Sequence, residues 1–420
     1  MGNAQAVAKE PTKAWVVTFA GTVINLCLGC LYAWSVWVKF LTDKDFMISQ
    51  GWAPLTAEQA SNPASLCILV FALLMIPGGK IQDKFGPKVA ASIGGLAIGI
   101  GLIIAGAMKS YGGILFGFGL LGGIGMGVGY AAPTPAALKW FGPHRRGLIA
   151  GLVVSGYGFA AFYVAPLARY LITHYSMSAS FYVLGVLYLI VILAAAQALA
   201  WPEPGYVPPA PPTTAQTAAK AAAQTRYDWE ASEMLRTWQY YALVLMFCIN
   251  TQAGLLLIGH AAKMIKTVMA AGYLLVSWGA IFNSVGRIGT GVISDRIGRT
   301  NALILNYIAA CVVMFLFPTL LNIKNVPLLF IAAAVGFWCY GGGLSLFPSF
   351  TADFYGPKNL GFNYGLVFLG WGFGAFMPKL AGRIYDKYHS YDYAFYIAGV
   401  LLIVGIVLAL ITKRPRYAKE

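Results

Sequence analysis

The stretch IFNSVGRIGTGVISDRIGR (281–299) joins an apolar segment to a charged loop, and the loop occurs twice in the chain. Gly291-Val-Ile-Ser-Asp295-Arg296-Ile-Gly298 matches Gly79-Lys-Ile-Gln-Asp83-Lys84-Phe-Gly86, and both follow the pattern Gly-x-x-x-Asp-[Lys/Arg]-x-Gly. The two aspartates lie 212 residues apart in a chain of 420. The repeat indicates that the chain consists of two related halves.

The composition is that of a membrane protein with many spans. Of the 420 residues, 59% are hydrophobic and only 10% are charged, and the mean hydropathy is +0.70. A soluble protein of this length could not bury so much apolar surface. Apolar runs long enough to cross a bilayer recur, and we predict twelve transmembrane helices. They lie near residues 14–38, 62–80, 89–108, 112–136, 147–170, 179–201, 238–259, 271–293, 301–321, 326–348, 360–382 and 391–412.

The predicted spans divide into two sets of six, and each repeated loop follows the second span of its set. We therefore predict an all-α polytopic membrane protein made of two six-helix bundles. Residues 1–201 form the first bundle, 202–237 a cytoplasmic linker and 238–420 the second bundle. The linker begins with six prolines and becomes rich in Ala and Thr, which is typical of a flexible tether. Its end, DWEASEMLRTWQY (228–240), is predicted to form a short amphipathic helix with Trp229, Met234, Leu235 and Trp238 towards lipid.

The net charge of +15 is explained by membrane topology rather than by nucleic-acid binding, because the basic residues lie singly in loops. With the N-terminus cytoplasmic, 18 of the 29 Lys and Arg residues fall inside and ten outside. We therefore expect a multi-pass protein of the plasma membrane with both termini cytoplasmic. The first span is too long for a signal peptide and lacks a cleavage site, so we expect it to be retained.

The remaining basic residue, Arg287, falls within the eighth predicted span. It precedes Asp295 by eight residues, which places it ~12 Å inside the membrane at 1.5 Å per helical residue. A central arginine costs at least ~2.5–3.5 kcal/mol to insert, so it needs a partner. Apart from the two termini, all acidic residues lie in loops or at span ends. An anionic ligand is therefore a better partner than a distant structural carboxylate.

Other polar and aromatic side chains occur at similar depths. Asn283 lies one helical turn before Arg287 on the same face. The other candidates for the binding site are Tyr130, Tyr340, Tyr32 and Trp371. For Tyr32, Tyr340 and Trp371, packing with a single hydrogen bond is an equally good interpretation. Asn25 and the run Asn250–Gln252 are better explained as hydrogen bonds between helices.

One central cation, no central carboxylate and several aromatic donors describe a pocket for a small anion with one charge. Sugars would need more amide and acidic groups, organic cations a buried acid, and dicarboxylates a second cation. An anion channel would need a continuous basic lining, which one arginine does not provide. The chain has no enzyme motif in a solvated setting, and we expect no catalytic residue, cofactor or metal.

The two repeated loops resemble the signature of the major facilitator superfamily. Tyr130-Ala-Ala with Lys139-Trp140-Phe141, Gly286-Arg287, Leu346-Phe347-Pro348-Ser349, Asn363-Tyr364-Gly365 and Glu233-Met234-Leu235-Arg236-Thr237 resemble the oxalate/formate antiporter family within the monocarboxylate-transporter group. The resemblance implies two bundles that rock about a central site. It also implies that Asp83, Lys84, Asp295 and Arg296 control the conformation. By the same resemblance, Arg287 binds the substrate carboxylate, with Tyr32, Tyr130 and, less directly, Tyr340 around it.

Two positions depart from the resemblance. Oxalate antiporters have a lysine in the middle of span eleven, where this chain has Trp371, so a dicarboxylate would keep one charge unpaired. Animal monocarboxylate transporters pair the arginine with an aspartate that is thought to carry the proton, and here that position is Asn283. We expect a monomeric secondary transporter for a small monocarboxylate such as lactate or pyruvate, with a proton as co-substrate. An anion exchanger of the oxalate/formate kind is the alternative.

Overall fold

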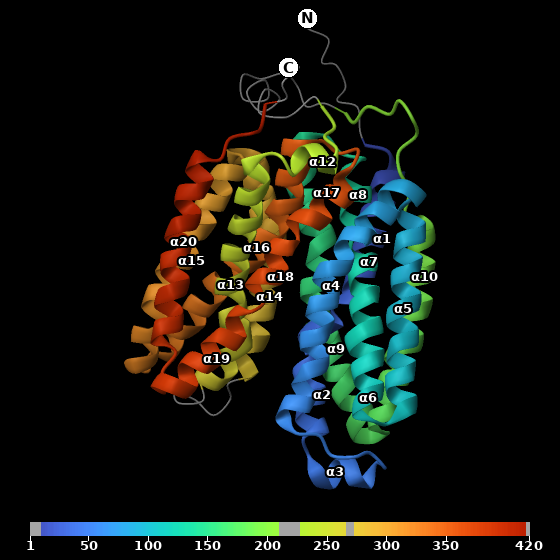
Figure 1. Cartoon of the computed structure of the whole chain (residues 1–420), viewed down its shortest axis with the longest axis vertical. Helices are drawn as coiled ribbons and strands as arrows, with labels where there is room; N and C mark the ends of the chain where they lie inside the picture. The colour runs from blue at the N-terminus through green and yellow to red at the C-terminus, as the bar shows by residue number, and fades with distance from the viewer. Residues whose placement is uncertain (1–9, 210–226, 266–272, 417–420) are drawn as a thin grey trace, which may run out of the picture.

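The computed structural model describes residues 10–209, 227–265 and 273–416, and these residues form helices and no strand. Residues 210–226, the middle of the predicted linker, lie outside the described residues. Figure 1 shows two helical bundles side by side, with α1 to α10 in one and α13 to α20 in the other. The all-α fold and the arrangement in two bundles are confirmed.

The first bundle contains the six predicted spans of the first half, some of them divided into shorter helices. Its elements are α1 (Thr12–Leu28), η1 (Gly29–Ala33), α2 (Trp34–Leu41), α3 (Lys44–Ser49), α4 (Ala57–Phe85), α5 (Pro87–Met108), α6 (Tyr111–Ile114), the π-helical η2 (Leu115–Gly122), α7 (Gly123–Tyr130), α8 (Pro133–Leu138), η3 (Pro143–Arg145), α9 (Arg146–His174) and α10 (Met177–Ala198).

The second bundle follows the same order. Its elements are α12 (Ala231–Met234), α13 (Trp238–Ile265), α14 (Tyr273–Ile297), α15 (Arg299–Asn322), α16 (Val326–Tyr355), α17 (Leu360–Val367), α18 (Leu369–Gly374), α19 (Met377–Tyr388) and α20 (Asp392–Ile411). The predicted span 360–382 is interrupted twice, because glycines at 370, 372 and 374 and Pro378 weaken helix propagation.

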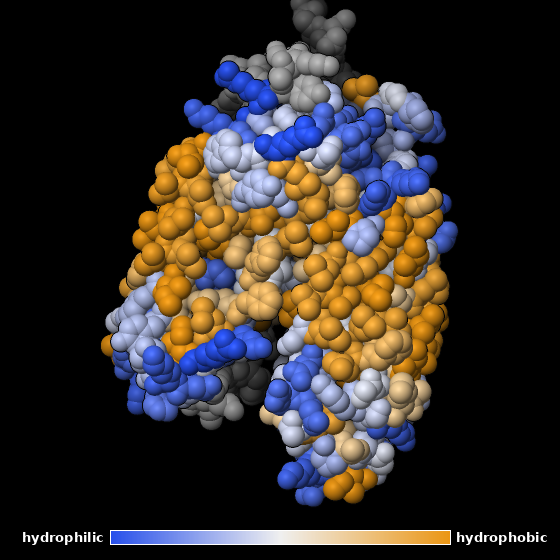
Figure 2. All heavy atoms as spheres, viewed as in Figure 1, coloured by the Kyte–Doolittle hydropathy of each residue, from blue (hydrophilic) through white to orange (hydrophobic). Residues whose placement is uncertain are grey.

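Eleven helical segments among the described residues are long and apolar enough to cross a membrane. α14 is not among them, because Asn283, Ser284 and Arg287 lower its hydropathy. α14 nevertheless occupies the place of the eighth predicted span. Figure 2 shows apolar side chains around the middle of the molecule and hydrophilic side chains at both ends, as expected for a membrane protein.

The bundles contact each other along two seams, α9 with α14 and α4 with α17. Each seam contains a glycine pair at its closest approach. A Cβ atom on Gly291 would lie 2.1 Å from the carbonyl oxygen of Gly147, and one on Gly79 would lie 2.1 Å from that of Gly361. The first glycine of the repeated loop is therefore required for helix contact. The last one, Gly86 or Gly298, has a φ of 93° or 92°, which favours glycine.

The two ends of the molecule differ. We call the end that carries Asp83, Asp295 and α12 the latch end, and the end that carries α3 and α19 the open end. Both seams lie towards the latch end, where α17 packs against α4 (Figure 1). At the open end the bundles diverge, and Figure 2 shows a hollow between them. In this conformation the bundles are in contact at the latch end, and the space between them opens towards the open end.

Candidate functional site

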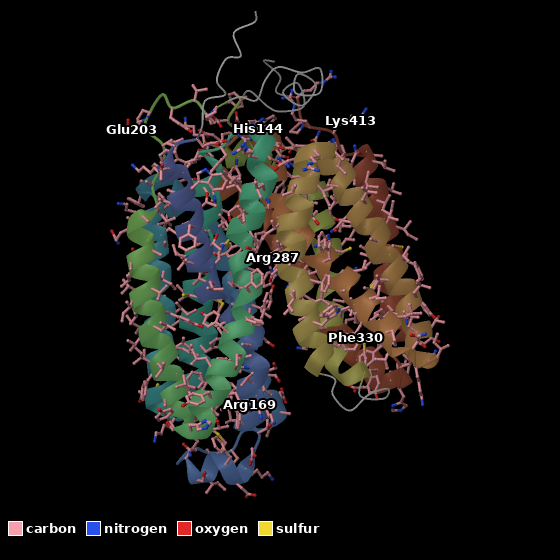
Figure 3. All side chains as sticks on the ribbon, turned by 180° about the vertical axis from the view of Figure 1, so that it is seen from behind. His144, Arg169, Glu203, Arg287, Phe330 and Lys413 are labelled. Atoms are coloured by element: carbon pink, nitrogen blue, oxygen red, sulfur yellow. The ribbon has the colours of Figure 1, made fainter. Side chains whose placement is uncertain are left out.

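Arg287 lies on the face of α14 that packs against α9 of the first bundle, and its side chain is 1% exposed. Figure 3 shows it midway along the molecule, at the boundary between the bundles. None of the ion pairs among the described residues includes it. The guanidinium is thus buried without a carboxylate partner in the described part of the chain.

The hydrogen bonds of Arg287 go to neutral acceptors. Its Nη1 donates to the carbonyl oxygen of Val154 at 2.7 Å, and its Nε donates to Oδ1 of Asn283 at 3.4 Å. Its Nη2 is buried and has no hydrogen-bond partner among the described residues. One edge of the guanidinium therefore has unused donors, and a carboxylate is the acceptor that fits such an edge.

Tyr32, Tyr340 and Trp371 form a hydrogen-bonded chain across the two bundles. The hydroxyl oxygens of Tyr32 and Tyr340 lie 2.8 Å apart, and Nε1 of Trp371 donates to the Tyr340 hydroxyl at 3.1 Å. Tyr340 and Trp371 are buried, and Tyr32 is partly exposed. A Cβ atom on the neighbouring Gly341 would lie 1.9 Å from the carbonyl oxygen of Asn283, so this chain lies beside the turn of α14 that carries Asn283 and Arg287.

Tyr130 of α7 joins the same cluster through the ring of Tyr157, which also packs on Tyr32. Its ring is surrounded by aromatic rings, with centroid distances of 5.4 Å to Tyr157, 5.5 Å to Phe71 and 5.6 Å to Phe368. Such pairs pack well, and the hydroxyl group of a buried tyrosine usually finds a hydrogen-bond partner. The structure therefore brings all six residues chosen from the sequence into one cluster: Arg287, Asn283, Tyr130, Tyr340, Tyr32 and Trp371.

Several residues of this cluster were missed by the sequence analysis. The Phe71 ring lies 5.2 Å from both Phe368 and Trp371, and the Tyr157 ring lies 5.1 Å from Tyr32. Tyr364 interacts electrostatically with both Tyr130 and Arg287. Tyr364 lies in one of the motifs that carry the family resemblance, but it was not chosen as a site residue. Phe71, Tyr157 and Phe368 resemble any aromatic packing residue in an apolar span, so no signal in the sequence marked them as site residues.

The side-chain amides of Asn25, Asn250 and Gln252 have structural partners, as expected, whereas Oγ1 of Thr251 has no hydrogen-bond partner among the described residues. Nδ2 of Asn25 donates to the carbonyl of Val153 at 2.9 Å, and Nδ2 of Asn250 donates to the carbonyl of Tyr340 at 3.3 Å. Gln252 bonds to carbonyl groups of α13 and α20. These bonds connect helices and do not reach Arg287.

At the latch end, Asp83 of α4 binds the first turn of α17 in the other bundle. Its carboxylate accepts from the backbone N–H groups of Gly361 at 3.2 Å and Phe362 at 2.7 Å, the second and third residues of that helix. These N–H groups have no partner within α17, and the helix dipole favours a negative charge beside them.

Asp295 of α14 makes the equivalent contact with α9. It accepts from the N–H groups of Gly147 at 2.9 Å and Leu148 at 2.8 Å, again the second and third residues of a helix from the other bundle. The repeated aspartates therefore occupy equivalent positions in the two seams. Their contacts are broken if the bundles separate at the latch end.

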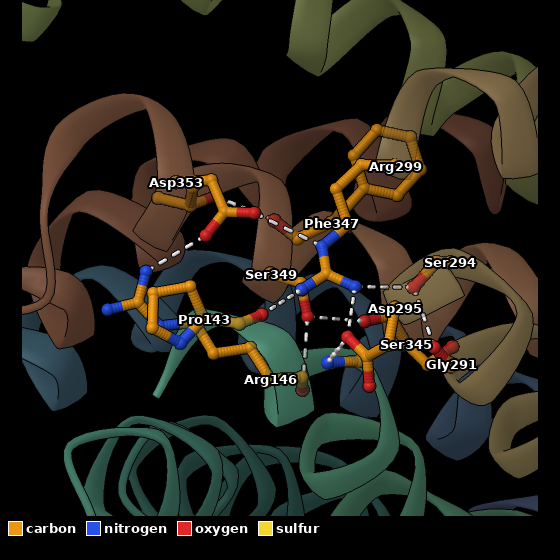
Figure 4. Close-up of polar contacts among 12 residues, drawn as sticks. Pro143, Arg146, Gly291, Ser294, Asp295, Arg299, Ser345, Phe347, Ser349 and Asp353 are labelled. Atoms are coloured by element: carbon orange, nitrogen blue, oxygen red, sulfur yellow. Dashed lines mark hydrogen bonds and ion pairs between the residues drawn. The ribbon is translucent and has the colours of Figure 1, made fainter. Parts of the chain in front are cut away.

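Charged residues around Asp295 form a network, shown in Figure 4. Arg299 binds Asp295 at 2.5 Å and Asp353 at 3.1 Å. Asp353 also binds Arg146 of the first bundle at 2.9 Å. All these side chains are about nine-tenths buried, so each charge depends on its partners.

The cation beside Asp83 is Lys139, whose Nζ lies 3.9 Å from the carboxylate. Burial lowers the pKa of the Lys139 ammonium, and the charges of Asp83 and Asp228 oppose this effect. Nζ also lies 4.6 Å from the ring centroid of Trp201, where the linker begins.

Lys84 and Arg296, for which the resemblance implies a role in controlling the conformation, do not pair with the two aspartates in this conformation. Lys84 and Arg296 are exposed, and none of the ion pairs among the described residues includes them. Consecutive residues on a helix point about 100° apart, so a residue next to a buried aspartate faces away from the seam. In this conformation the cations beside the aspartates are Lys139 and Arg299.

The predicted amphipathic helix at the linker end was also partly wrong. α12 has only four residues, and Trp229 and Met234 are buried against protein. Trp229 donates its N–H to the carbonyl of Tyr355 at 2.9 Å, and its own carbonyl accepts from Asn359 at 3.0 Å. These partners at the α16–α17 junction are remote in sequence. Of the four residues predicted to face lipid, Leu235 and Trp238 are exposed.

Comparisons with known proteins agree with this architecture. The sequence profile described as Major Facilitator Superfamily matches residues 15–378 and 267–420. The oxalate:formate antiporter of Oxalobacter formigenes is 29% identical over 92% of this chain and 88% of its own length. The uncharacterized MFS-type transporter YhjX of Escherichia coli is 27% identical over 86% of this chain and 85% of its own length. Monocarboxylate transporter 13 of Bos taurus is 25% identical over 83% of this chain and 79% of its own length.

Solved structures show the same fold. A double-tryptophan mutant of XylE has a TM-score of 0.74 at 14% identity and covers 98% of each chain. FucP in the outward conformation has a TM-score of 0.65 at 15% identity, covering 95% of this chain and 100% of its own.

Proposed function

Because this chain belongs to the major facilitator superfamily, we propose that it transports a small monocarboxylate of the lactate or pyruvate type by alternating access. The observation that carries the proposal is the Arg287 guanidinium, which is buried between the bundles, has no carboxylate partner among the described residues, and has an Nη2 without a hydrogen bond. A carboxylate substrate supplies both the missing charge and the missing acceptor.

The surroundings of Arg287 favour a substrate with one charge. The other largely buried cations in the described part of the chain, Arg146, Arg299 and Lys139, already have Asp353 or Asp83 beside them. Trp371 occupies the position at which the resemblance to oxalate antiporters implies a second cation. A second carboxylate would therefore be desolvated without a counter-charge.

The aromatic lining favours a small substrate with a polar group near its carboxylate. Rings of Phe71, Phe368 and Trp371 provide apolar walls, and Tyr130 and Tyr340 contribute hydroxyl groups to the same cluster. The 2-hydroxyl of lactate or the 2-oxo group of pyruvate would be a suitable partner for these hydroxyls.

We propose proton symport as the form of coupling, and anion exchange is a second candidate. The observation that favours exchange is Asn283, the polar side chain that bonds to Nε of Arg287 and cannot titrate. The relative from Oxalobacter formigenes is named as an antiporter. We further propose the bundle boundaries 1–201 and 238–420, a cytoplasmic latch end in the plasma membrane, and a monomeric carrier.

Uptake of radiolabelled lactate into proteoliposomes tests both parts of the proposal. Symport predicts uptake driven by an imposed pH gradient into vesicles without internal anion. Exchange predicts uptake only into vesicles loaded with a counter-anion. If neither lactate nor pyruvate enters under either condition, the substrate assignment is wrong.

Arg287→Lys tests the role of the guanidinium. The substitution keeps one positive charge but removes the planar pair of donors, so uptake should fall by at least about tenfold. Arg169→Lys is the matched control, because Arg169 is an exposed residue of α9 towards the open end. Near-normal uptake by Arg287→Lys contradicts the assigned role.

A further inference from the structure

The Arg287 side chain belongs both to the candidate binding site and to the contact between the bundles. Its Nη1 donates to the carbonyl of Val154, a residue of α9, at 2.7 Å. Its other hydrogen bond within the described residues, to Asn283, is long at 3.4 Å, and Nη2 has none. In this conformation the buried charge therefore depends mainly on one backbone carbonyl of the opposite bundle.

The bond to Val154 lies at the inner end of the α9–α14 seam. Nearest the latch end, Gly147 contacts Gly291. One turn further in, a Cβ atom on Gly151 would lie 2.4 Å from the backbone oxygen of Arg287. The side-chain bond to Val154 follows. If α9 and α14 separate to open the latch end, this bond must break together with the Asp295 contacts.

Gly158 provides the space that the guanidinium needs beside α9. It lies one turn beyond Val154, and a Cβ atom there would lie 2.6 Å from Oγ of Ser284 and 3.2 Å from Nε of Arg287. An alanine at this position would displace the Ser284 hydroxyl and shift the guanidinium by a few tenths of an ångström. Gly158 is therefore a positioning residue for the bond between the bundles.

A substrate carboxylate competes with the Val154 carbonyl for the same donors. The bond to Val154 joins a charged donor to a neutral acceptor. A carboxylate brings the opposite charge and can accept two parallel bonds, so it is the stronger partner. A ligand shifts a conformational equilibrium by the difference between its affinities for the two states. Binding to Nη1 and Nη2 would thus favour the state in which Val154 is released.

We propose that the bond from Arg287 to Val154 keeps the latch end closed while the site is empty, and that a bound carboxylate replaces Val154 and permits α9 and α14 to separate. The inference rests on the proposed function and adds the means by which substrate controls the latch end. It predicts that the empty carrier changes conformation slowly. Lactate in the external buffer binds the carrier and speeds its return, so lactate efflux should be faster into lactate-containing buffer than into lactate-free buffer. This result is expected for both symport and exchange.

Accessibility of Ser349 reports opening of the latch end. Ser349 is fully buried, and its Oγ donates to the carbonyl of Arg146 in the other bundle at 3.3 Å. We would label Ser349→Cys with a hydrophilic maleimide in the purified full chain, with the parent chain and its six native cysteines as the blank. Saturating lactate should raise the labelling rate by roughly fivefold or more, the lower range of coupling between sites.

Gly158→Ala should raise labelling of Ser349→Cys without lactate and reduce the effect of lactate, because the guanidinium is displaced from Val154. Arg287→Ala, which deletes the bond, should give fast labelling with and without lactate. The matched control is Ser155→Ala in α9, because its hydroxyl donates only to Leu152 of the same helix among the described residues. It should keep the response of the parent chain.

Equilibrium dialysis of radiolabelled lactate on the same sample separates the possible failures. If lactate binds and labelling does not rise, the inference is wrong and the proposed function stands. If Gly158→Ala and Arg287→Ala both label like the Ser155→Ala control, the inference is also wrong. If lactate neither binds nor enters proteoliposomes, the proposed function fails and the inference with it.

Discussion

The hydroxyl oxygens of Tyr32 and Tyr340 lie 2.8 Å apart and connect the two bundles on the open-end side of Arg287. Tyr340 lies 15 residues, or about 22 Å, before the latch-end terminus of α16. Arg287 lies 10 residues, or about 15 Å, before the latch-end terminus of α14. A solute that enters from the open end therefore meets this tyrosine pair before it reaches the arginine.

The two tyrosines should contribute unequally to stability. Tyr32→Phe removes one hydrogen bond, worth about 1 kcal/mol. Tyr340→Phe removes the same bond and also leaves Nε1 of the buried Trp371 without its acceptor, which costs about 1–3 kcal/mol more. Thermal unfolding in detergent should therefore show a larger loss of Tm for Tyr340→Phe. Equal losses would mean that Trp371 finds another acceptor.

Trp371→Lys should change the preferred substrate. The substitution places a second cation beside Tyr340 and Arg287, so oxalate uptake should appear and lactate uptake should fall. Inserting the lysine costs about 2.5–3.5 kcal/mol, which a second substrate carboxylate can offset. Competition between labelled lactate and oxalate in proteoliposomes measures the shift. Trp371→Phe is the control for lost packing, and oxalate uptake by that variant would refute the explanation.

Asp295→Asn should open the latch end more than Asp83→Asn. Asp295 binds two N–H groups and also forms a close ion pair with Arg299. Without Asp295, Arg299 has Asp353 as its remaining carboxylate partner. Asp83 also binds two N–H groups, but its nearest cation, Lys139, lies 3.9 Å away. Breaking a buried pair costs about 3 kcal/mol or more.

The rate of maleimide labelling at Ser349→Cys measures how far the latch end opens in Asp295→Asn and in Asp83→Asn. The control is Asp43→Asn, because Asp43 is an exposed cap of α3 at the open end, and labelling should not change there. Faster labelling in Asp83→Asn than in Asp295→Asn would reverse the predicted order.

Lys139 should give the latch end a dependence on pH in the alkaline range. Burial places its pKa in the folded protein below the value of about 10.5 expected when the chain is unfolded. Between these two values the unfolded chain binds more protons, so the free energy of unfolding rises with pH. The difference in Tm between the parent and Lys139→Met should follow this rise. A difference that stays constant from pH 8 to pH 10.5 would contradict the lowered pKa.

The sequence by itself determined the class of the fold and the position of the buried charge. Hydropathy is a local property, so the spans were found without tertiary information. Even α14, the least apolar of them, was among the spans predicted from apolar runs, at 271–293. The repeat at Asp83 and Asp295 gave the two halves, and helical periodicity placed Asn283 beside Arg287 because the two residues share a face of one helix.

Only the tertiary structure decided which groups these residues contact. The acceptor for Arg287 is the backbone carbonyl of Val154, and every residue has such a carbonyl, so no residue type identifies it. Lys139 rather than Lys84 approaches Asp83, because the packing of the bundles selects one face of each helix. Trp229 is buried against Tyr355, more than 100 residues away, although its own segment is amphipathic. Contacts between remote segments depend on how whole helices pack, and local sequence does not carry that information.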